Sequence, residues 1–261
     1  MTDEAIAQRS GARTLMLALI GAVGGILSGT CGVGGGILMV PMLIGWYGMD
    51  QRRASATSLL AIVPTSVVGA TGYAFSGQVA WLPAVVIGVV AMFGVSIGSW
   101  LLVRLPLGVL RNLFIALLLV AAVRMALFGS NEVGDVAEGW GVWPGFAGLG
   151  LLMGVASGLF GIGGGAIAVP VLVGVFGLAD LLAKGTSLAA MIPTAVSGSI
   201  ANARRGVLDI RAGLLVGLSA TIFSVVGVAL SFLVPARVSG ILFAIVLLLA
   251  VVQLVRRGRR S

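Results

Sequence analysis

The chain has 261 residues, of which 59% are hydrophobic and only 9% are charged, and it has no histidine. Because a soluble domain carries about 25% charged residues, this composition excludes an ordinary water-soluble fold. The formal net charge of +8 is assigned to the cytoplasmic loops and tail of a membrane protein rather than to a nucleic-acid partner.

Uncharged stretches recur at lengths that suit a bilayer, which needs about 20 apolar residues per helical crossing. In chain order they include 14–48, 54–75, 79–103, 142–179, 185–203, 212–234 and 238–255, and each half has four apolar segments. The sequence therefore predicts an all-α polytopic membrane protein with eight apolar segments.

The same motif occurs twice, as SGTCGVGGGILMVP from Ser28 and as SGLFGIGGGAIAVP from Ser157. The offset of 129 positions holds without a gap from about Gly21 to Val109. It pairs Thr-Ser with Thr-Ser and Pro-Thr with Pro-Thr further along each copy. The predicted organisation is a first transmembrane repeat at 1–128, an acidic extracytoplasmic linker at 129–141 and a second repeat at 142–261 with a basic tail. Duplicated halves are common in transporters, whose substrate sites lie between the halves.

The first segment of each half is too long for one crossing. Thirty-five helical residues would extend roughly 52 Å, against about 30 Å of hydrocarbon. Each segment has a glycine cluster at its centre, so it is either a broken helix that still crosses or a hairpin that enters and leaves on one side. We favour the hairpin, with three spanning helices per half and the second half inverted.

Arginine positions favour this topology through the positive-inside rule. With two hairpins, roughly 13 basic residues lie inside and about 3 (Arg124, Lys184 and Arg237) lie outside, together with the acidic linker. With eight full crossings the division falls to about 10 and 6. The expected location is the inner (cytoplasmic) membrane, multi-pass, with both termini cytoplasmic.

The glycine clusters suit an anion. The half-helix after each cluster, starting near Ile37 or Ala166, exposes unpaired N–H groups and the positive end of its helix dipole. Glycine also lets a ligand approach the backbone closely. Two inverted copies would aim two such ends at one point. The competing interpretation is that these glycines serve close helix packing, to which most of the 41 glycines are assigned.

Hydroxyl groups at membrane depth would add hydrogen-bond donors without charge, although Ser and Thr also commonly bond their own helix backbone. Pro64 and Pro193 are expected to break their helices. The predicted substrate-binding residues are Ser28, Gly32, Gly34, Gly35, Gly36, Thr57, Ser58, Thr65, Ser157, Gly161, Gly163, Gly164, Gly165, Thr186, Ser187 and Thr194.

Catalytic, metal and cofactor sites are not expected. No Asp or Glu falls inside a predicted span, and Cys31 alone cannot form a multi-cysteine site. Lys184, Arg204 and Arg205 flank helices of the second half. They are interpreted as loop anchors, with attraction of anions to a cavity mouth as the alternative. An enzyme is therefore not predicted.

The doubled GxxSGxxGxGGGxxxVP block, at Gly25–Pro41 and Gly154–Pro170, resembles the TauE/SafE sulfite exporter family, also called the toluenesulfonate uptake permease family. The resemblance covers nearly the whole chain. It implies seven or eight membrane segments and transport of a sulfur-containing anion. Cys31-Gly32 departs from the aromatic-Gly at Phe160-Gly161, so the two half-sites need not be equivalent.

Residues and resemblance together predict a transporter, and more specifically an exporter, of sulfite or an organosulfonate. The expected partners are a small anion, the lipid bilayer and, as an open question, a second copy of the chain, with no nucleic acid. An anion channel and a non-transporting membrane scaffold remain as alternatives.

Overall fold

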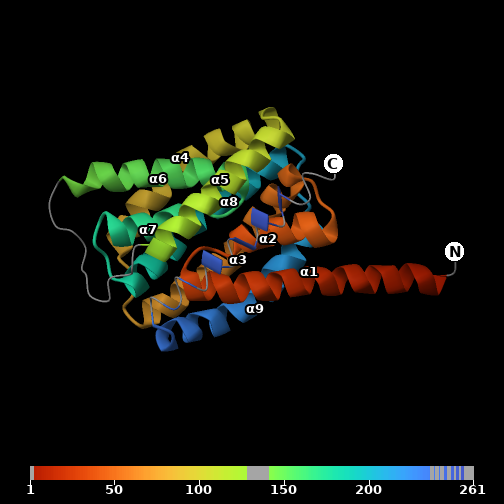
Figure 1. Ribbon diagram of the computed structural model, residues 1–261, viewed down its shortest axis with the longest axis horizontal. Helices are drawn as coiled ribbons and strands as arrows, with labels where there is room; N and C mark the ends of the chain where they lie inside the picture. Colours follow the sequence, from red (N-terminus) through yellow and green to blue (C-terminus); the bar gives the residue numbers. More distant parts are fainter. Residues whose placement is uncertain are drawn as a thin grey trace.

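The computed structural model describes residues 3–127 and 141–235, together with scattered positions between 238 and 255. The first half contains α1 (Asp3–Cys31), α2 (Gly36–Met42), the π-helix η1 (Leu43–Tyr47), α3 (Gln51–Phe75), α4 (Trp81–Arg104) and α5 (Leu107–Leu127). The second half contains α6 (Val142–Phe160), α7 (Gly165–Gly174), α8 (Asp180–Arg204) and α9 (Ile210–Leu233) (Figure 1). The prediction of a helical protein is confirmed, while the predicted linker lies outside the described residues apart from Gly141.

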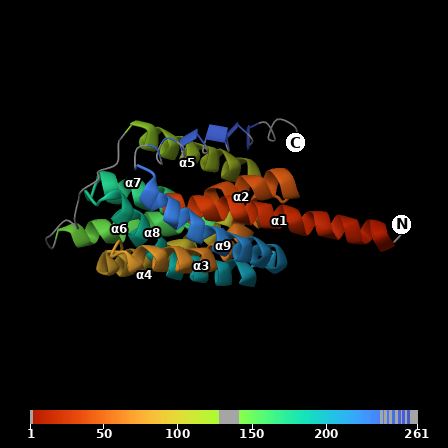
Figure 2. The same ribbon diagram turned by 90° about the horizontal axis from the view of Figure 1, so that it is seen from below.

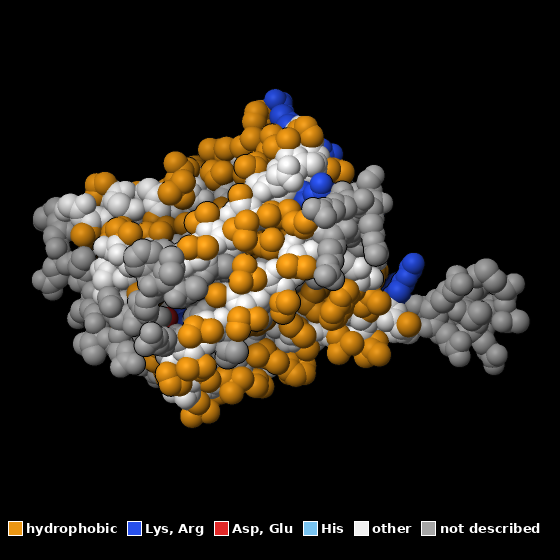
Figure 3. Space-filling model, viewed as in Figure 1, with side chains coloured by type: hydrophobic (Ala, Val, Ile, Leu, Met, Phe, Trp, Pro, Cys, Tyr) orange, Lys and Arg blue, Asp and Glu red, His pale blue; other side chains and the backbone are white. Residues whose placement is uncertain are grey.

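Five of the described helices are long and apolar enough to cross a membrane. They are Gly11–Cys31 of α1, Gln51–Phe75, Trp81–Arg104, Val142–Phe160 and Ile210–Leu233. Large apolar side chains such as Phe93, Leu218 and Ile222 are exposed on these helices. Figure 3 shows hydrophobic side chains spread over much of the visible face. A surface of this kind is stable in hydrocarbon and not in water, which agrees with a multi-pass membrane protein.

The repeat seen in the sequence is also a repeat of structure. Shifted by 129 positions, the bounds of α3 and α4 coincide with those of α8 and α9 at both ends. The end of α1 and the start of α2 likewise coincide with the end of α6 and the start of α7. Each half therefore uses the same succession of a helix, a break, a short helix and two long helices.

The two halves are interlocked through exchanged helices rather than packed as separate bundles. α1 lies along α9, and α6 lies along α4. Gly25 of α1 faces Ala220 of α9, and a Cβ at Gly25 would meet the Ala220 carbonyl oxygen. The corresponding Gly154 of α6 faces the Ala91 carbonyl of α4 in the same way. Small residues at a helix–helix interface in a membrane let two backbones approach closely. Glycines of α1 facing α9, and glycines of α6 facing α4, form what we call the glycine stripes, and these hold the two halves together.

α3 and α8 occupy the centre and run in opposite directions. Gly198 near the end of α8 contacts Leu59 near the start of α3, whereas Gly185 near the start of α8 contacts Tyr73 near the end of α3. α5 lies along one face of the bundle, beside α2 and α7 (Figure 2). There Phe114 of α5 stacks on Phe160 at the end of α6 with ring centroids 5.4 Å apart.

The expectation that Pro64 and Pro193 break their helices is wrong. α3 and α8 continue through them over 25 residues each. The missing N–H removes only one helical bond, and neighbouring helices can accommodate the ring. Gly217 of α9 lies against Pro64, and Gly88 of α4 lies against Pro193. Each proline ring therefore packs where the partner helix has no side chain.

The arginines whose side chains the structure describes gather at one end of the molecule. This end contains the starts of α1, α3, α5 and α9 and the ends of α4 and α8, and Figure 3 shows its basic side chains on the side where α1 begins. Its arginines are Arg13, Arg52, Arg53, Arg104, Arg111, Arg204, Arg205 and Arg211. Arg52 helps to end α4, since its Nη2 donates to the Leu105 carbonyl oxygen at 2.7 Å.

The glycine stripe makes a prediction about stability. Gly154→Ala should lower the melting temperature in detergent, because its Cβ would meet the Ala91 carbonyl and overpacking costs about 1–3 kcal/mol. Gly148→Ala on the same helix is the matched control, since a Cβ there would meet nothing within 4 Å. Equal melting temperatures for the two variants would contradict the role given to the stripe.

Candidate anion site

Each glycine cluster interrupts the helix with the same backbone conformation. Gly32, Gly34 and Gly35 have φ values of 67°, 77° and 71°. Their counterparts Gly161, Gly163 and Gly164 have φ values of 68°, 72° and 82°. Residues with a Cβ rarely adopt this left-handed region. The sequence therefore breaks α1 and α6 where three such positions fall within four residues.

The chain doubles back after the first break. α1 and α3 both run parallel to α9. Along α1, Gly21 meets Val216 and Gly29 meets Ser224 of α9. Along α3, Leu60 meets Gly213 and Gly72 meets Val228 of α9. α2 and η1 must therefore return from the end of α1 to the start of α3. Gly35 lies against the Gly24 carbonyl of α1, as expected for a hairpin. We call residues 32–36 the first tip and residues 161–165 the second tip.

The two tips touch each other. A Cβ at Gly36 would meet the Gly161 carbonyl oxygen and would lie 2.8 Å from the Cα of Ile162. A Cβ at Gly165 would lie 2.7 Å from the Cα of Val33 and 2.9 Å from the Gly32 carbonyl oxygen. Backbone thus lies directly against backbone, and the two glycine clusters contact each other.

Two apolar side chains lie where the tips meet. Ile62 of α3 and Met191 of α8 correspond to each other in the repeat. Both lie within 3.5 Å of where a Cβ would stand at Gly34 or Gly163, with the Met191 sulfur nearest at 2.8 Å and 2.6 Å. Apolar side chains of both halves therefore pack against the place where the two tips meet.

Backbone amides at the tips are left unpaired. Within the described part of the chain, no acceptor is found for the amides of Gly34, Gly35, Gly36 and Ile37 or of Gly163, Gly164, Gly165 and Ala166. Gly35 and Gly164 instead accept bonds from residues of the following helix, as in Met39 N–H to Gly35 O at 3.1 Å. Such groups are costly in hydrocarbon unless a ligand or water satisfies them.

Three serine hydroxyls beside the tips are fully buried and have no partner among the described atoms: Ser28, Ser157 and Ser187. Ser28 and Ser157 precede the tips by one helical turn, and their carbonyls accept from Gly32 N–H at 2.9 Å and Gly161 N–H at 2.8 Å. Ser58, the counterpart of Ser187, donates instead to the Gly161 carbonyl at 2.7 Å. Three of the predicted hydroxyls thus have no hydrogen-bond partner within the described residues.

The predicted threonines have other partners. Thr57 Oγ1 accepts from Asp209 N–H at 3.3 Å, and Thr186 Oγ1 accepts from Ala80 N–H at 2.9 Å. These bonds tie α3 to the start of α9 and α8 to the start of α4. Thr65 and Thr194 donate to carbonyls of their own helices, at 2.8 Å and 2.9 Å. All four hydroxyls support the helices, as short polar side chains often do.

Lys184 was interpreted from the sequence as a loop anchor, and this is wrong. Its side chain is 1% exposed, and its Nζ lies 2.6 Å from Asp180 Oδ2 on the preceding turn. The Cα of Lys184 lies 2.5 Å from where a Cβ would stand at Gly32. A repeat comparison could have drawn attention to it, because the matching position in the first half is Ser55.

Metal chemistry finds no support in the described residues, where no group of three or more His, Cys, Asp or Glu side chains comes together. Cys31 is buried at the first tip and lies 3.7 Å from Thr30 Oγ1. What the site offers is unpaired N–H groups, hydroxyls and one buried ammonium group. This set of donors suits an anion.

The unequal serines give a prediction. Ser58→Ala should lower the melting temperature of the ligand-free protein, because it leaves the buried Gly161 carbonyl without its donor, at a cost of about 1–3 kcal/mol. Ser187→Ala at the matching position removes a hydroxyl without a partner and should change the melting temperature little. A larger loss for Ser187→Ala than for Ser58→Ala would contradict this assignment.

Comparison with known proteins agrees with this architecture. The pattern of the family described as Sulfite exporter TauE/SafE matches residues 2–125 and 146–261. A probable membrane transporter protein of Methanocaldococcus jannaschii is 28% identical over 163 residues, which are 60% of this chain and 60% of that protein. One of Xylella fastidiosa is 29% identical over 198 residues, which are 72% of this chain and 74% of that protein.

The match to the Methanocaldococcus jannaschii relative therefore spans less than two thirds of that protein. No solved structure gives a significant match. The family pattern covers both halves of the chain, including both tips. The protein belongs to the TauE/SafE family of membrane transporters.

Proposed function

We propose that the protein is a carrier that exports a sulfur-containing anion, such as sulfite or an organosulfonate, through a site between the two tips. The observation that carries this proposal is the contact between the two tips, whose eight backbone amides have no acceptor within the described residues. Three buried hydroxyls on the adjoining helices also have no partner there. Amides and hydroxyls bind oxyanions through several short hydrogen bonds and leave release possible.

A sulfonate or sulfite group fits the chemistry of this site. It presents three oxygen atoms, each of which accepts hydrogen bonds, to donors that arrive from two directions. The description of the family as sulfite exporters supports the same substrate class. The relatives compared above carry only the general name of probable membrane transporter proteins.

The topology proposed for this function is an inverted repeat with two re-entrant hairpins. α3 and α8 run in opposite directions, and so do the other corresponding helices, which supports a twofold axis perpendicular to the helices and hence in the membrane plane. In such transporters, rocking of one half against the other exposes the central site to alternate sides. The apolar pair Ile62 and Met191 is then the element that must move aside.

The direction of transport follows from charge. The end that carries the described arginines is assigned to the cytoplasm by the positive-inside rule. The membrane potential, negative inside, favours the exit of an anion by about 2.3 kcal/mol per charge at 100 mV. Export therefore needs no proton relay.

The direct test is efflux of labelled sulfite from proteoliposomes, preceded by a thermal-shift comparison of sulfite, sulfate, thiosulfate and sulfoacetate. Saturable, potential-driven efflux is expected. Efflux that does not saturate, with unitary currents in planar bilayers, would indicate a channel. Absence of any anion effect on either measurement would indicate a scaffold protein and end the proposal.

The buried hydroxyls provide a sharper version of this test. Ser28→Ala with Ser157→Ala should weaken sulfite binding by at least about tenfold, because hydrogen bonds to a charged group contribute about 1.5–3 kcal/mol each. Ser224→Ala on α9 is the control, since its hydroxyl is also buried and unpartnered among the described atoms but lies against Gly69 of α3. Equal affinities for the double variant and the control would contradict a site at the tips.

A further inference from the structure

The repeat allows the two half-sites to be compared position by position. In the second half, Asp180 and Lys184 form a buried ion pair at 2.6 Å, one turn apart on α8. In the first half, Gln51 and Ser55 occupy the matching positions on α3, where Gln51 Nε2 donates to Ser55 Oγ at 3.5 Å. Equivalent positions of the two halves thus carry different pairs. The pair on α8 is charged, and the pair on α3 is neutral.

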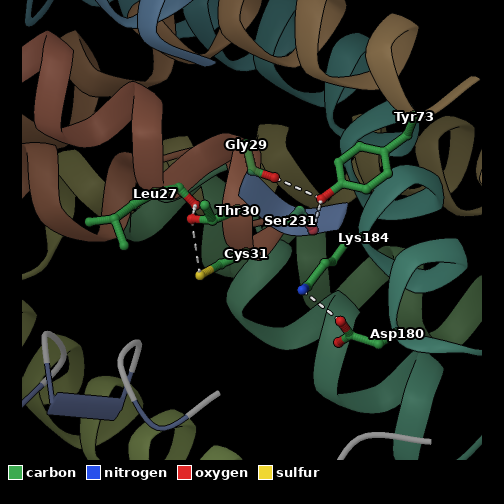
Figure 4. Close-up of polar contacts among 8 residues, drawn as sticks. All are labelled: Leu27, Gly29, Thr30, Cys31, Tyr73, Asp180, Lys184 and Ser231. Atoms are coloured by element: carbon green, nitrogen blue, oxygen red, sulfur yellow. Dashed lines mark hydrogen bonds and ion pairs between the residues drawn. The ribbon is translucent and has the colours of Figure 1, made fainter. Parts of the chain in front are cut away.

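The backbone and the first side-chain carbons of Lys184 adjoin the first tip at Gly32. Lys184 packs against Gly32, and Ser187, whose buried hydroxyl has no partner among the described atoms, follows one turn later on α8. Figure 4 shows Lys184 and Asp180 in the same region as Tyr73 of α3 and Cys31 at the end of α1. The Tyr73 hydroxyl is occupied, because it lies 2.7 Å from both the Gly29 carbonyl and Ser231 Oγ.

We propose that the Lys184 ammonium group pairs with the negative charge of the transported anion. When no anion is bound, the ammonium group pairs with the Asp180 carboxylate instead. This inference rests on the proposed function and deepens it, since it locates the charge of the substrate at the first tip. The second tip then contacts the anion through neutral donors alone.

Asp180 is suited to this exchange because it has a second source of stabilisation. It is the first residue of α8 and lies in the first turn. The unpaired N–H groups and the positive dipole end of a helix favour a carboxylate at that position. Asp180 can therefore give up Lys184 to an incoming anion without becoming an isolated buried charge, which would be strongly unfavourable.

An internal carboxylate also explains how a buried lysine is kept beside a site that must release its ligand. Asp180 gives the buried ammonium group a carboxylate partner that is present whether or not an anion is bound. With Asp180, departure of the anion is accompanied by return of the ion pair. Anions that cannot displace a carboxylate from Lys184 would then be excluded, which makes this pair a determinant of specificity.

The experiment measures sulfite affinity by isothermal titration calorimetry on the purified full-length protein. Lys184→Met should weaken sulfite binding roughly tenfold to a hundredfold, the range expected for losing a hydrogen bond to a charged group. Asp180→Asn should strengthen it severalfold, because the competing carboxylate is removed. Lys184→Arg should retain most of the affinity. Ser55→Ala, at the neutral matching position, should change affinity by less than about threefold.

Lys184→Met leaves Asp180 without its partner, so the double variant Asp180→Asn with Lys184→Met serves as the folded reference. It should bind sulfite as weakly as Lys184→Met. The inference is overturned if the double variant binds like the wild type, or if Asp180→Asn weakens binding as much as Lys184→Met does. If the wild type binds none of the four anions in the thermal-shift comparison, the proposed function itself fails.

Discussion

The two tips pack backbone against backbone where the two halves of the chain meet. At Gly36 and Gly165 the backbone of one tip lies so close to the backbone of the other that a methyl group would not fit. The conformations at Gly32, Gly34 and Gly35, and at their counterparts, are ones that other residues rarely adopt. The helices outside the tips then have a clear task. α1 and α6 lead into the two tips. Close packing of their glycines against α9 and α4 fixes the position of each tip along the neighbouring helix.

This arrangement concentrates unsatisfied donors in a place where hydrocarbon would make them costly. Unpaired N–H groups cost several kcal/mol each in lipid, so broken backbone at this depth must be buried in protein or contact a polar ligand. In this structure the tips are buried, and Ile62 and Met191 pack against the place where they meet. Under the proposed transport function, access to the buried tips requires Ile62 and Met191 to move aside.

Much of the fold followed from the sequence because its signals are local. The glycine clusters predicted breaks with half-helices starting near Ile37 and Ala166, and the helices start one residue earlier, at Gly36 and Gly165. The constant offset predicted equivalent halves. The exchange of α1 and α6 between the halves was not predictable in the same way, since a stripe of small residues indicates close packing without identifying the partner helix.

The polar groups were harder to predict, because their roles depend on neighbours distant in sequence. Thr57 and Thr186 bond amides of the other half, which no local pattern indicates. A lysine near a helix end usually reaches water. Lys184 is buried because α8 packs against the first tip, and no local sequence pattern predicts this contact. Pro64 and Pro193 are tolerated for a similar reason, since glycines of α9 and α4 receive their rings.

The most direct test of this account is an experimental structure of the protein in lipid nanodiscs with sulfite bound. Sulfite density is expected in contact with amides of both tips, within hydrogen-bond distance of Ser28 or Ser157, and on the Lys184 side of the Ile62 and Met191 pair. Sulfite located away from the tips, or tips separated by lipid or by another helix, would contradict it.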